Sequence, residues 1–321
     1  MNTCVTDLTY YLPERVIDNE YLAEKCGIDR AFLDEKVGIK ERRMAAPDET
    51  TSAMAAQAAK EILAKSQTAA DQIDLLILCT QNPDYRLPTT ACLLHGRLGL
   101  RKDCACFDVN LGCSAFTYAL SIADAMVKAN RAKKALLVMA DQYTKIIDYH
   151  DKNTAGLFGD AASAALLTSC RDGAGILDVD LGTDGSGALH LVAPNSGVAR
   201  EEGRGSCLFM NSREILRFSL FTVPSSIRRV LSRNGLKKED VKQFILHQAN
   251  RYMLQEVQRV IQLAPEQMLI DMEKVGNTVS SSIPIAWKHY IDDGKQQPND
   301  LMVLCGFGVG LSWGTILYRC P

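Results

Sequence analysis

The sequence lacks several features that would indicate common classes of protein. No window is apolar for long enough to cross a bilayer, and MNTCVTDLTYYLPERVIDNE at the N-terminus has no basic segment followed by an apolar run. The formal net charge is only -2, so there is no basic surplus for nucleic acid. We therefore expect a soluble, cytoplasmic protein that binds neither nucleic acid nor a membrane.

The cysteines also lack the spacing of a metal or disulfide framework. There are 11 of them, an odd number, with no CxxC pair and no secretory signal, so most are expected to be reduced and buried. Cys104 and Cys106 alternate in a predicted strand, which places both on one face but supplies only two ligands. We expect no metal site, and the question becomes which thiol reacts.

The apolar segments alternate between strand and helix patterns. Hydrophobic residues make up 47% and charged residues 23% of the 321 residues, as in a globular protein of two domains or two halves. Three short apolar runs predict buried strands, at 73–80, 133–140 and 159–168. Apolar residues at steps of three and four predict helices over 51–66 and 114–130. This alternation is typical of an α/β fold.

The second part of the chain repeats the order of the first. Residues 240–248, 299–306 and 310–318 correspond in type to the three earlier strands. We therefore predict two similar halves, residues 1–171 and 172–321. The junction is placed in the Gly- and Asp-rich stretch 169–187, where neither a helix nor a strand pattern persists.

Cys113 differs from the other cysteines in its position. A strand pattern ends near Asn110, Gly112 permits a sharp turn, and a helix pattern begins at Ser114. The free N–H groups and positive dipole end at a helix start favour an anion, so the thiol of Cys113 is expected to shift towards thiolate.

Two polar residues of the second half are candidate partners. His247 ends the strand FILHQ, at the type of edge where α/β proteins bind ligands, although a core histidine would fit the same pattern. Asn277 lies in VGNTVSSS, which also suits an ordinary turn. The glycine-rich 306–314 is followed by a strand instead of a helix, so it suits backbone donation to a substrate oxygen better than dinucleotide binding.

These segments, in order, resemble one known family. FDVNLGCSAFTYAL around Cys113, FGDAASAA at 158–165, HQAN with His247, VGNT with Asn277 and the terminal GFGVGLSWG are similar to β-ketoacyl-acyl-carrier-protein synthase III of the thiolase superfamily. The resemblance covers nearly the whole chain. It implies a duplicated, five-layer αβαβα fold, a homodimer, and a reaction without a metal or redox cofactor.

The resemblance also implies a role for each motif. Cys113 would take an acyl group from a thioester, usually acyl-CoA, and the backbone N–H groups of Cys113 and Val309 would form the oxyanion hole. Malonyl-acyl carrier protein would then lose CO2. His247 and Asn277 would hold the enolate oxygen while its carbon attacks the acyl group.

Several positions depart from the family pattern or are less specific. Phe32, Lys36 and Lys152 stand where tryptophan and arginines usually hold CoA, so CoA would be held differently or replaced by a carrier-protein donor. Leu87 stands at the position that reaches into the partner's acyl tunnel, often as phenylalanine, which suggests a starter other than acetyl. Three arginines match or neighbour positions that meet the acidic carrier protein: Arg217, Arg251 and Arg259.

Three other functions remain open at this point. The first is an acyltransferase, or a condensing enzyme of a specialised pathway that uses an unusual starter. The second is a cysteine hydrolase, because Cys, His and Asn occur in the same order in papain-like proteases, although the CGSCW-type signature is missing. The third is a catalytically silent partner protein.

Overall fold

Two five-stranded sheets with the same internal order form the frame of the molecule. The computed structural model describes residues 2–170 and 173–321. The first sheet has the order β1-β7-β6-β4-β5 and the second has the order β12-β11-β13-β14-β8. The strands of the first sheet are β1 (Asn2–Tyr11), β4 (Leu75–Cys79), β5 (Ala105–Val109), β6 (Lys134–Asp141) and β7 (Ala161–Cys170). Those of the second are β8 (Gly175–Thr183), β11 (Gln243–Leu246), β12 (Met268–Leu269), β13 (Leu301–Gly308) and β14 (Ser312–Arg319).

Strand direction shows that the second sheet repeats the first. In the first sheet β4 runs parallel to β5 and β6, and β7 runs antiparallel to β6 and β1. In the second, β11 runs parallel to β12 and β13, and β14 runs antiparallel to β13 and β8. The strands at 75–79, 134–141 and 161–170 therefore correspond to those at 243–246, 301–308 and 312–319, as the sequence predicts.

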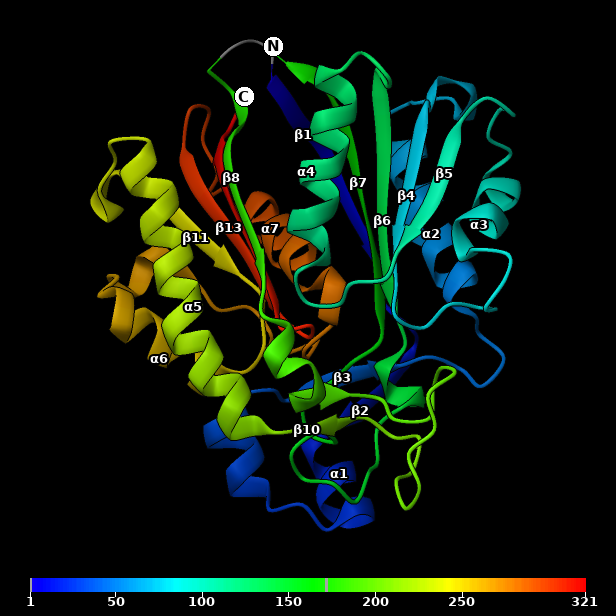
Figure 1. Cartoon of the computed structure of the whole chain (residues 1–321), viewed down its shortest axis with the longest axis vertical. Coiled ribbons are helices and arrows are strands. Elements are labelled where there is room, and N and C mark those ends of the chain that lie inside the picture. The colour runs from blue at the N-terminus through cyan, green and yellow to red at the C-terminus, as the bar shows by residue number, and fades with distance from the viewer. Residues whose placement is uncertain (1, 171–172) are drawn as a thin grey trace.

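The helices cover both sheets and fill the space between them. Helices α4 (Ala115–Lys128) and α7 (Ser282–Asp292) lie between the two sheets (Figure 1). Helices α2 (Thr51–Lys65) and α3 (Thr90–Leu98) cover the first sheet, and α5 (Ser212–Arg233) and α6 (Arg251–Ile261) cover the second. This arrangement confirms the predicted five-layer αβαβα fold, and the predicted helices over 51–66 and 114–130 are α2 and α4.

Aromatic rings from both halves pack against one another in the core between the sheets. Trp287 of α7 meets Phe116 of α4 edge-on at 6.4 Å and Tyr318 of β14 at 5.1 Å between ring centroids. Edge-to-face pairs at these separations add to the stabilisation from burial. All three side chains are almost fully buried. They hold the central helices, and therefore the start of α4, in a fixed position between the sheets.

Smaller elements gather at one end of the sheets. Helix α1 (Asn19–Cys26) and the strand pairs β2 (Arg15–Asp18) with β3 (Glu41–Met44) and β9 (Leu191–Val192) with β10 (Phe209–Met210) occupy the lower end of Figure 1. The Asp18 carboxylate caps α1 by accepting from the backbone N–H of Tyr21 at 2.7 Å. These elements form a cap beyond the strand ends.

The predicted junction differs from the structure in one respect. The stretch 169–187 was expected to lack regular structure, but it contains the end of β7 and all of β8. Strand β8 forms because β14 supplies a full antiparallel partner from Ser312 to Arg319, a tertiary pairing that its Gly- and Asp-rich sequence does not indicate. The predicted boundary between residues 171 and 172 lies outside the described residues.

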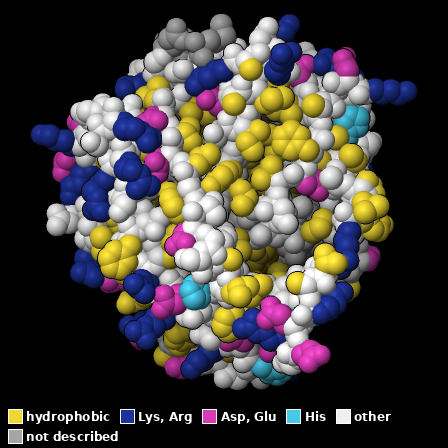
Figure 2. All heavy atoms as spheres, viewed as in Figure 1, with side chains coloured by type: hydrophobic (Ala, Val, Ile, Leu, Met, Phe, Trp, Pro, Cys, Tyr) yellow, Lys and Arg dark blue, Asp and Glu magenta, His cyan; other side chains and the backbone are white. Residues whose placement is uncertain are grey.

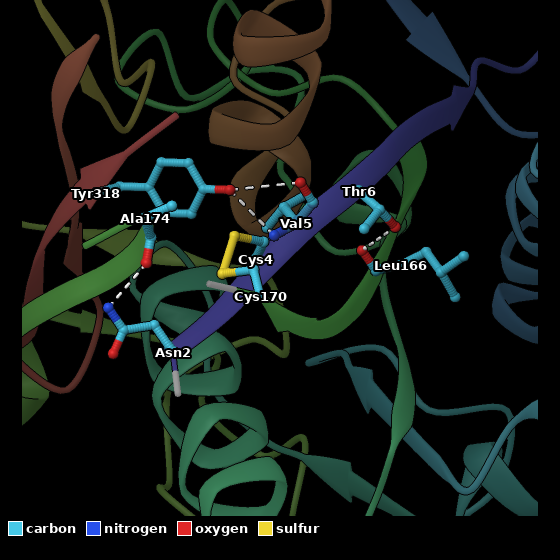
Figure 3. Close-up of a disulfide and its surroundings, with 8 residues drawn as sticks. All are labelled: Asn2, Cys4, Val5, Thr6, Leu166, Cys170, Ala174 and Tyr318. Carbon is cyan, nitrogen blue, oxygen red and sulfur yellow. Dashed lines mark hydrogen bonds between the residues drawn. A yellow bond between two sulfur atoms is a disulfide. The ribbon is translucent and has the colours of Figure 1, made fainter. Parts of the chain in front are cut away.

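One disulfide joins the neighbouring strands β1 and β7. Cys4 of β1 and Cys170 of β7 are bonded, and Figure 3 shows the bridge beside Val5 and Tyr318. The Tyr318 hydroxyl accepts from the Val5 N–H at 3.1 Å and so ties β14 to β1. The other nine cysteines are free. Most cysteines are thus unbridged, as predicted, but burial holds for only five of the nine, because Cys92 and Cys207 are exposed and Cys26 and Cys106 are partly buried. The bridge joins two residues that are 166 positions apart in the sequence.

A half-buried hydrogen-bond network around His289 of α7 is expected to make the stability of the protein depend on pH. His289 Nδ1 lies 2.6 Å from an Asp271 oxygen and its Nε2 lies 3.0 Å from the Tyr10 hydroxyl. The bond to Asp271 raises the pKa of His289 above its ordinary value. Stabilisation by protonated His289 should be fully present below pH ~6.5 and be lost as the pH rises through the raised pKa.

We therefore predict that His289→Gln flattens the dependence of thermal stability on pH. The wild-type melting temperature should fall between about pH 6 and pH 8 by more than that of the variant. Differential scanning calorimetry across this range measures both curves. Parallel curves for the two proteins would contradict the assignment.

Candidate active site

Cys113 lies where the sequence predicts, between a strand and a helix start. It follows β5, and α4 begins two residues later at Ala115, whose N–H donates to the Gly112 carbonyl at 2.9 Å. The side chain is buried with only 6% of its surface exposed. The predicted strand over 104–110 is β5 at 105–109. Cys104 and Cys106 both pack against the apolar core that the first sheet forms with α2 and α3.

Strand β13 of the second half packs directly against the nucleophile. A Cβ at Gly306 would lie 2.7 Å from the Cys113 carbonyl oxygen, and one at Gly308 would lie 3.0 Å from the Cys113 Sγ. Both positions therefore require glycine. The hydroxyl oxygens of Ser114 and Ser312 are 2.7 Å apart across the same contact. The glycine-rich 306–314 is thus the hairpin between β13 and β14, and it forms one wall of the cysteine site.

His247 is fixed at the end of β11 by backbone and ring contacts. Its N–H donates to the Cys305 carbonyl at 2.8 Å, which extends the pairing of β11 with β13 by one residue. Its ring meets Phe307 edge-on at 5.7 Å between centroids, and Nδ1 lies 2.7 Å from the Ser282 hydroxyl. Burial lowers the pKa of His247 to about 3, so the imidazole is neutral at pH 7.

Asn277 is held in a loop that is paired with the FGDAASAA segment. Its N–H donates to the Leu157 carbonyl at 2.9 Å, and its carbonyl accepts from the Gly159 N–H at 3.1 Å. The side-chain Oδ1 accepts from the Val279 N–H at 3.0 Å. Because Oδ1 is engaged by this donor, the amide N–H2 is the group that Asn277 presents to the cavity.

All three residues that the sequence predicts to be catalytic line one cavity. Its volume is about 580 Å3, and Cys113, His247 and Asn277 all line it. Phe158, Phe307 and Gly308 line the same space. A thiol, an imidazole and a carboxamide in one buried, largely apolar cavity can hold a covalent acyl group and donate hydrogen bonds to an oxygen that develops charge.

Comparison with known proteins decides the family. The family model of the C-terminal domain of 3-oxoacyl-[acyl-carrier-protein (ACP)] synthase III matches residues 231–320, and a second model of the same enzyme matches residues 107–185. A β-ketoacyl-[acyl-carrier-protein] synthase III of Bacillus pumilus is 37% identical over 319 residues, which cover 99% of each chain.

Solved structures show the same relationship in three dimensions. A 3-oxoacyl-(acyl-carrier-protein) synthase III that is 37% identical superposes with a TM-score of 0.96, covering 99% of this chain and 100% of that one. The enzyme from Aquifex aeolicus is 34% identical, with a TM-score of 0.92 and 99% of each chain covered. The chain belongs to the 3-oxoacyl-acyl-carrier-protein synthase III family. It is accordingly an acyltransferase of the condensing type with a thiolase-like fold.

The mouth of the synthase cavity contains the three residues predicted to bind CoA. Phe32, Lys36 and Lys152 all line it. Arg213 and Tyr252, which the sequence did not bring forward, line it as well. Arg213 lies on α5 and Tyr252 on α6. The sequence around them has no motif that marks a binding residue, so only the packing of the two helices shows that these side chains line the mouth.

Leu87 and the three arginines lie elsewhere. The Leu87 side chain is 83% exposed and does not line the cavity of its own chain. Arg217 and Arg259 are exposed and pair with Glu214 and Glu256 on their own helices. Arg251 is less exposed: it bonds Glu273 at 3.4 Å and packs against Gly38.

The charge state of Cys113 differs from the sequence prediction. Burial, together with the charge of Asp141, raises the pKa of Cys113 to about 12, although the N–H groups of Val309 and of Cys113 itself act to lower it. The free thiol is therefore neutral at pH 7, and the expectation of a resting thiolate is wrong. Desolvation in a closed site outweighs the favourable helix start.

Across residues 2–170 and 173–321, no three His, Cys, Asp or Glu side chains are grouped as metal ligands. None of the helices in the described part combines the length and apolar character needed to span a bilayer.

Replacing Asp141 should make Cys113 more acidic. Asp141 accepts from the Gln81 N–H at 2.8 Å and from the Ser280 hydroxyl, and its negative charge opposes ionisation of the thiol. In Asp141→Asn the pH profile of Cys113 alkylation by iodoacetamide should move to lower pH by about 1 unit. Peptide mass spectrometry isolates Cys113 from the exposed Cys92 and Cys207.

A buried carboxylate far from the cavity provides the control. Asp124 lies near the end of α4 and bonds Lys128 at 2.8 Å. Asp124→Asn should leave the alkylation profile of Cys113 in place. An equal shift in both variants, or no shift in Asp141→Asn, would show that Asp141 does not set the acidity of the thiol.

Proposed function

We propose that the chain performs both half-reactions of a synthase III in this cavity, with Cys113 as nucleophile and with His247 and Asn277 as enolate donors. The observation that carries the proposal is that these three side chains, which come from both halves, line the same buried space. A cysteine hydrolase would need a water path and a base beside the thiol. Two neutral groups that present N–H donors suit carbon–carbon bond formation better.

In the first half-reaction Cys113 takes an acyl group from a thioester donor. A bond forms between its Sγ and the carbonyl carbon, the bond to the donor sulfur breaks, and the thiol proton ends on the departing sulfur. The backbone N–H groups of Val309 and Cys113 lie near enough to the thiol to act against the rise of its pKa. They would hold the tetrahedral oxyanion, and removal of one such donor typically lowers the rate by about 10²–10³.

In the second half-reaction malonyl-acyl carrier protein supplies the carbon nucleophile. The bond between the malonyl carbon and its carboxylate breaks, CO2 leaves, and the electron pair forms a thioester enolate. His247 and Asn277 would donate to the enolate oxygen while its carbon bonds to the acyl carbonyl. The Cys113 thiolate then departs and takes a proton from solvent. No metal or redox cofactor takes part in these steps as proposed.

Acyl-CoA is the proposed donor. Lys36, Lys152 and Arg213 place three cationic side chains at the cavity mouth, where the phosphates of CoA would lie, and Phe32 and Tyr252 add exposed aromatic faces. Lysine holds phosphate as a point charge and lacks the planar fork of arginine, so this grip is less directional than one made by two arginines.

Exposed arginines on α5 and α6 are the proposed contacts for the acidic carrier protein. Arg217 and Arg259 each expose 72% of their side chains, and their helices pack against each other beside the cavity mouth. Arg251 contributes less to this surface, because Glu273 and Gly38 already contact its guanidinium.

A homodimer is proposed because β5 at the sheet edge and one face of α4 carry apolar side chains that the described chain leaves only partly buried. Strand β5 has β4 as its neighbour and nothing on its outer side. Figure 2 shows apolar side chains around α4 and this edge. Phe107, Val109, Leu111, Ile122 and Met126 are the partly buried members. A second copy would bury them, and its exposed Leu87 would reach the neighbouring cavity.

Single substitutions should separate the two half-reactions. Cys113→Ala should give no acyl adduct in intact-protein mass spectra. His247→Ala and Asn277→Ala should still form the adduct with acyl-CoA, but CO2 release from malonyl carrier protein should fall by about 10²-fold or more. His95→Ala, on a remote helix, is the control and should release CO2 at the wild-type rate. Normal CO2 release by His247→Ala would refute the role of the histidine.

A charge on the apolar face should break the dimer. Ile122→Glu with Met126→Glu places carboxylates on the uncovered side of α4, and multi-angle light scattering should then report a monomer. Val198 is 89% exposed on a separate loop, so Val198→Glu should remain dimeric. A wild-type protein that is itself monomeric at micromolar concentration would contradict the dimer.

A further inference from the structure

Two thiols outside the catalytic cavity lie side by side at the edge of the first sheet. The Sγ atoms of Cys92 on α3 and Cys106 on β5 are 3.9 Å apart. Cys92 is exposed, Cys106 is partly buried, and neither lines the cavity that contains Cys113. The two half-reactions of the synthase use neither thiol, so the pair is a candidate site for separate thiol chemistry.

Regular elements of the fold hold the two sulfurs near each other. Cys106 and Asp108 point to the same face of β5, because side chains alternate along a strand. The Asp108 carboxylate accepts from the Thr90 and Ala91 N–H groups, both at 2.7 Å, and so holds the first turn of α3 against this face. Cys92 is the next residue of that turn. The contact between the thiols therefore follows from a strand and a helix start that are bonded to each other.

The separation of the sulfurs suits a disulfide that forms and breaks. A disulfide has about 2.05 Å between its sulfurs, so the two atoms must approach by roughly 2 Å. Rotation of the exposed Cys92 side chain between rotamers supplies such a shift without a movement of β5. Cys104, on the same strand, is buried, and its Sγ lies 3.7 Å from the Ala105 carbonyl. Cys92 is therefore the partner for Cys106.

The surroundings of each thiol indicate which one reacts first. The Thr89 hydroxyl donates to the Cys92 Sγ at 3.3 Å, and a donor in this position stabilises negative charge on sulfur. Burial, together with the neighbouring Cys92, raises the pKa of Cys106 to about 11, so Cys106 keeps its proton at pH 7. A solute also reaches the exposed Cys92 more easily. Cys92 is therefore the thiol that an oxidant meets first.

We propose that Cys92 and Cys106 form a reversible oxidation site that reduces a peroxide. The Cys92 sulfur attacks one oxygen of hydrogen peroxide, the O–O bond breaks, and the departing oxygen leaves as water with the Cys92 proton. The resulting sulfenic acid is then attacked by the Cys106 sulfur, and its hydroxyl group leaves as water with the Cys106 proton. One peroxide is reduced and two thiols are oxidised to one disulfide, which a small dithiol reduces again.

The site is separate from the surfaces that the synthase reaction uses. Phe107 and Val109, which belong to the proposed dimer contact, alternate with Cys106 along β5 and pack on the α4 side. Cys106 packs on the α3 side, so a second copy over the α4 face does not by itself cover the two thiols. The inference does not rest on the proposed function, because Cys113 takes no part in it.

A digest of the full-length protein without reductant tests the proposal. Trypsin and chymotrypsin separate the peptide that holds Cys92 from the peptide that ends at Phe107 and holds Cys104 and Cys106. After treatment with hydrogen peroxide the two peptides should be linked, and dithiothreitol should separate them. Cys104→Ser leaves Cys106 as the only thiol of the second peptide and should give the same link. Absence of the link, or a link only between two chains, would overturn the proposal.

Trapping with dimedone, which reacts with sulfenic acids, tests the order of the two steps. Cys106→Ser cannot close the bridge, so its yield of the Cys92 adduct should exceed that of the wild type by about 10-fold or more. Cys207 is also an exposed free cysteine, and its adduct should be equal in both proteins. Equal Cys92 adducts in both proteins would show that Cys106 does not close the bridge. If Cys106→Ser does not fold, the wild-type digest still decides whether the site exists.

Discussion

The close packing of β13 against the start of α4 is the contact on which the site depends. Two glycines at 306 and 308 let a strand of the second half approach Cys113 of the first, and larger residues would collide with its carbonyl and sulfur. The contact buries the thiol and places the Val309 N–H near it. It also places Phe307 against the ring of His247. Cys113 of the first half and His247 and Asn277 of the second therefore line one cavity.

Burial explains the charge states of these groups. Burial keeps the Cys113 thiol and the His247 imidazole uncharged at pH 7, and it shifts the pKa of Asp141 up to about 7. In such a space charge is costly before the reaction and hydrogen-bond donors are strong when charge appears. Hydrogen-bond donors therefore matter more than resting charge in this site, and the Val279 N–H orients one of them by engaging Asn277 Oδ1.

The sequence was sufficient for the parts that local pattern encodes. Strand and helix periods predicted the repeat, and the junction of β5 with α4 singled out Cys113 before any partner was known. Effects of tertiary packing could not be predicted from the sequence. The pKa of Cys113 follows from the whole enclosure, β8 follows from its pairing with β14, and Arg251 is occupied by Glu273 from a distant loop. Ser282, which contacts His247 Nδ1, was visible only as one hydroxyl in VSSS, where no pattern separates it from its neighbours.

The central claim is that one cavity couples acyl transfer on Cys113 to decarboxylation of the second substrate. Its most direct measurement is a single turnover of protein already acylated on Cys113, mixed with malonyl carrier protein, in which CO2, acyl-cysteine and product are quantified together. The account predicts equal amounts of CO2 released, acyl-cysteine lost and 3-oxoacyl carrier protein formed. Loss of the acyl group as free acid, without CO2, would contradict it.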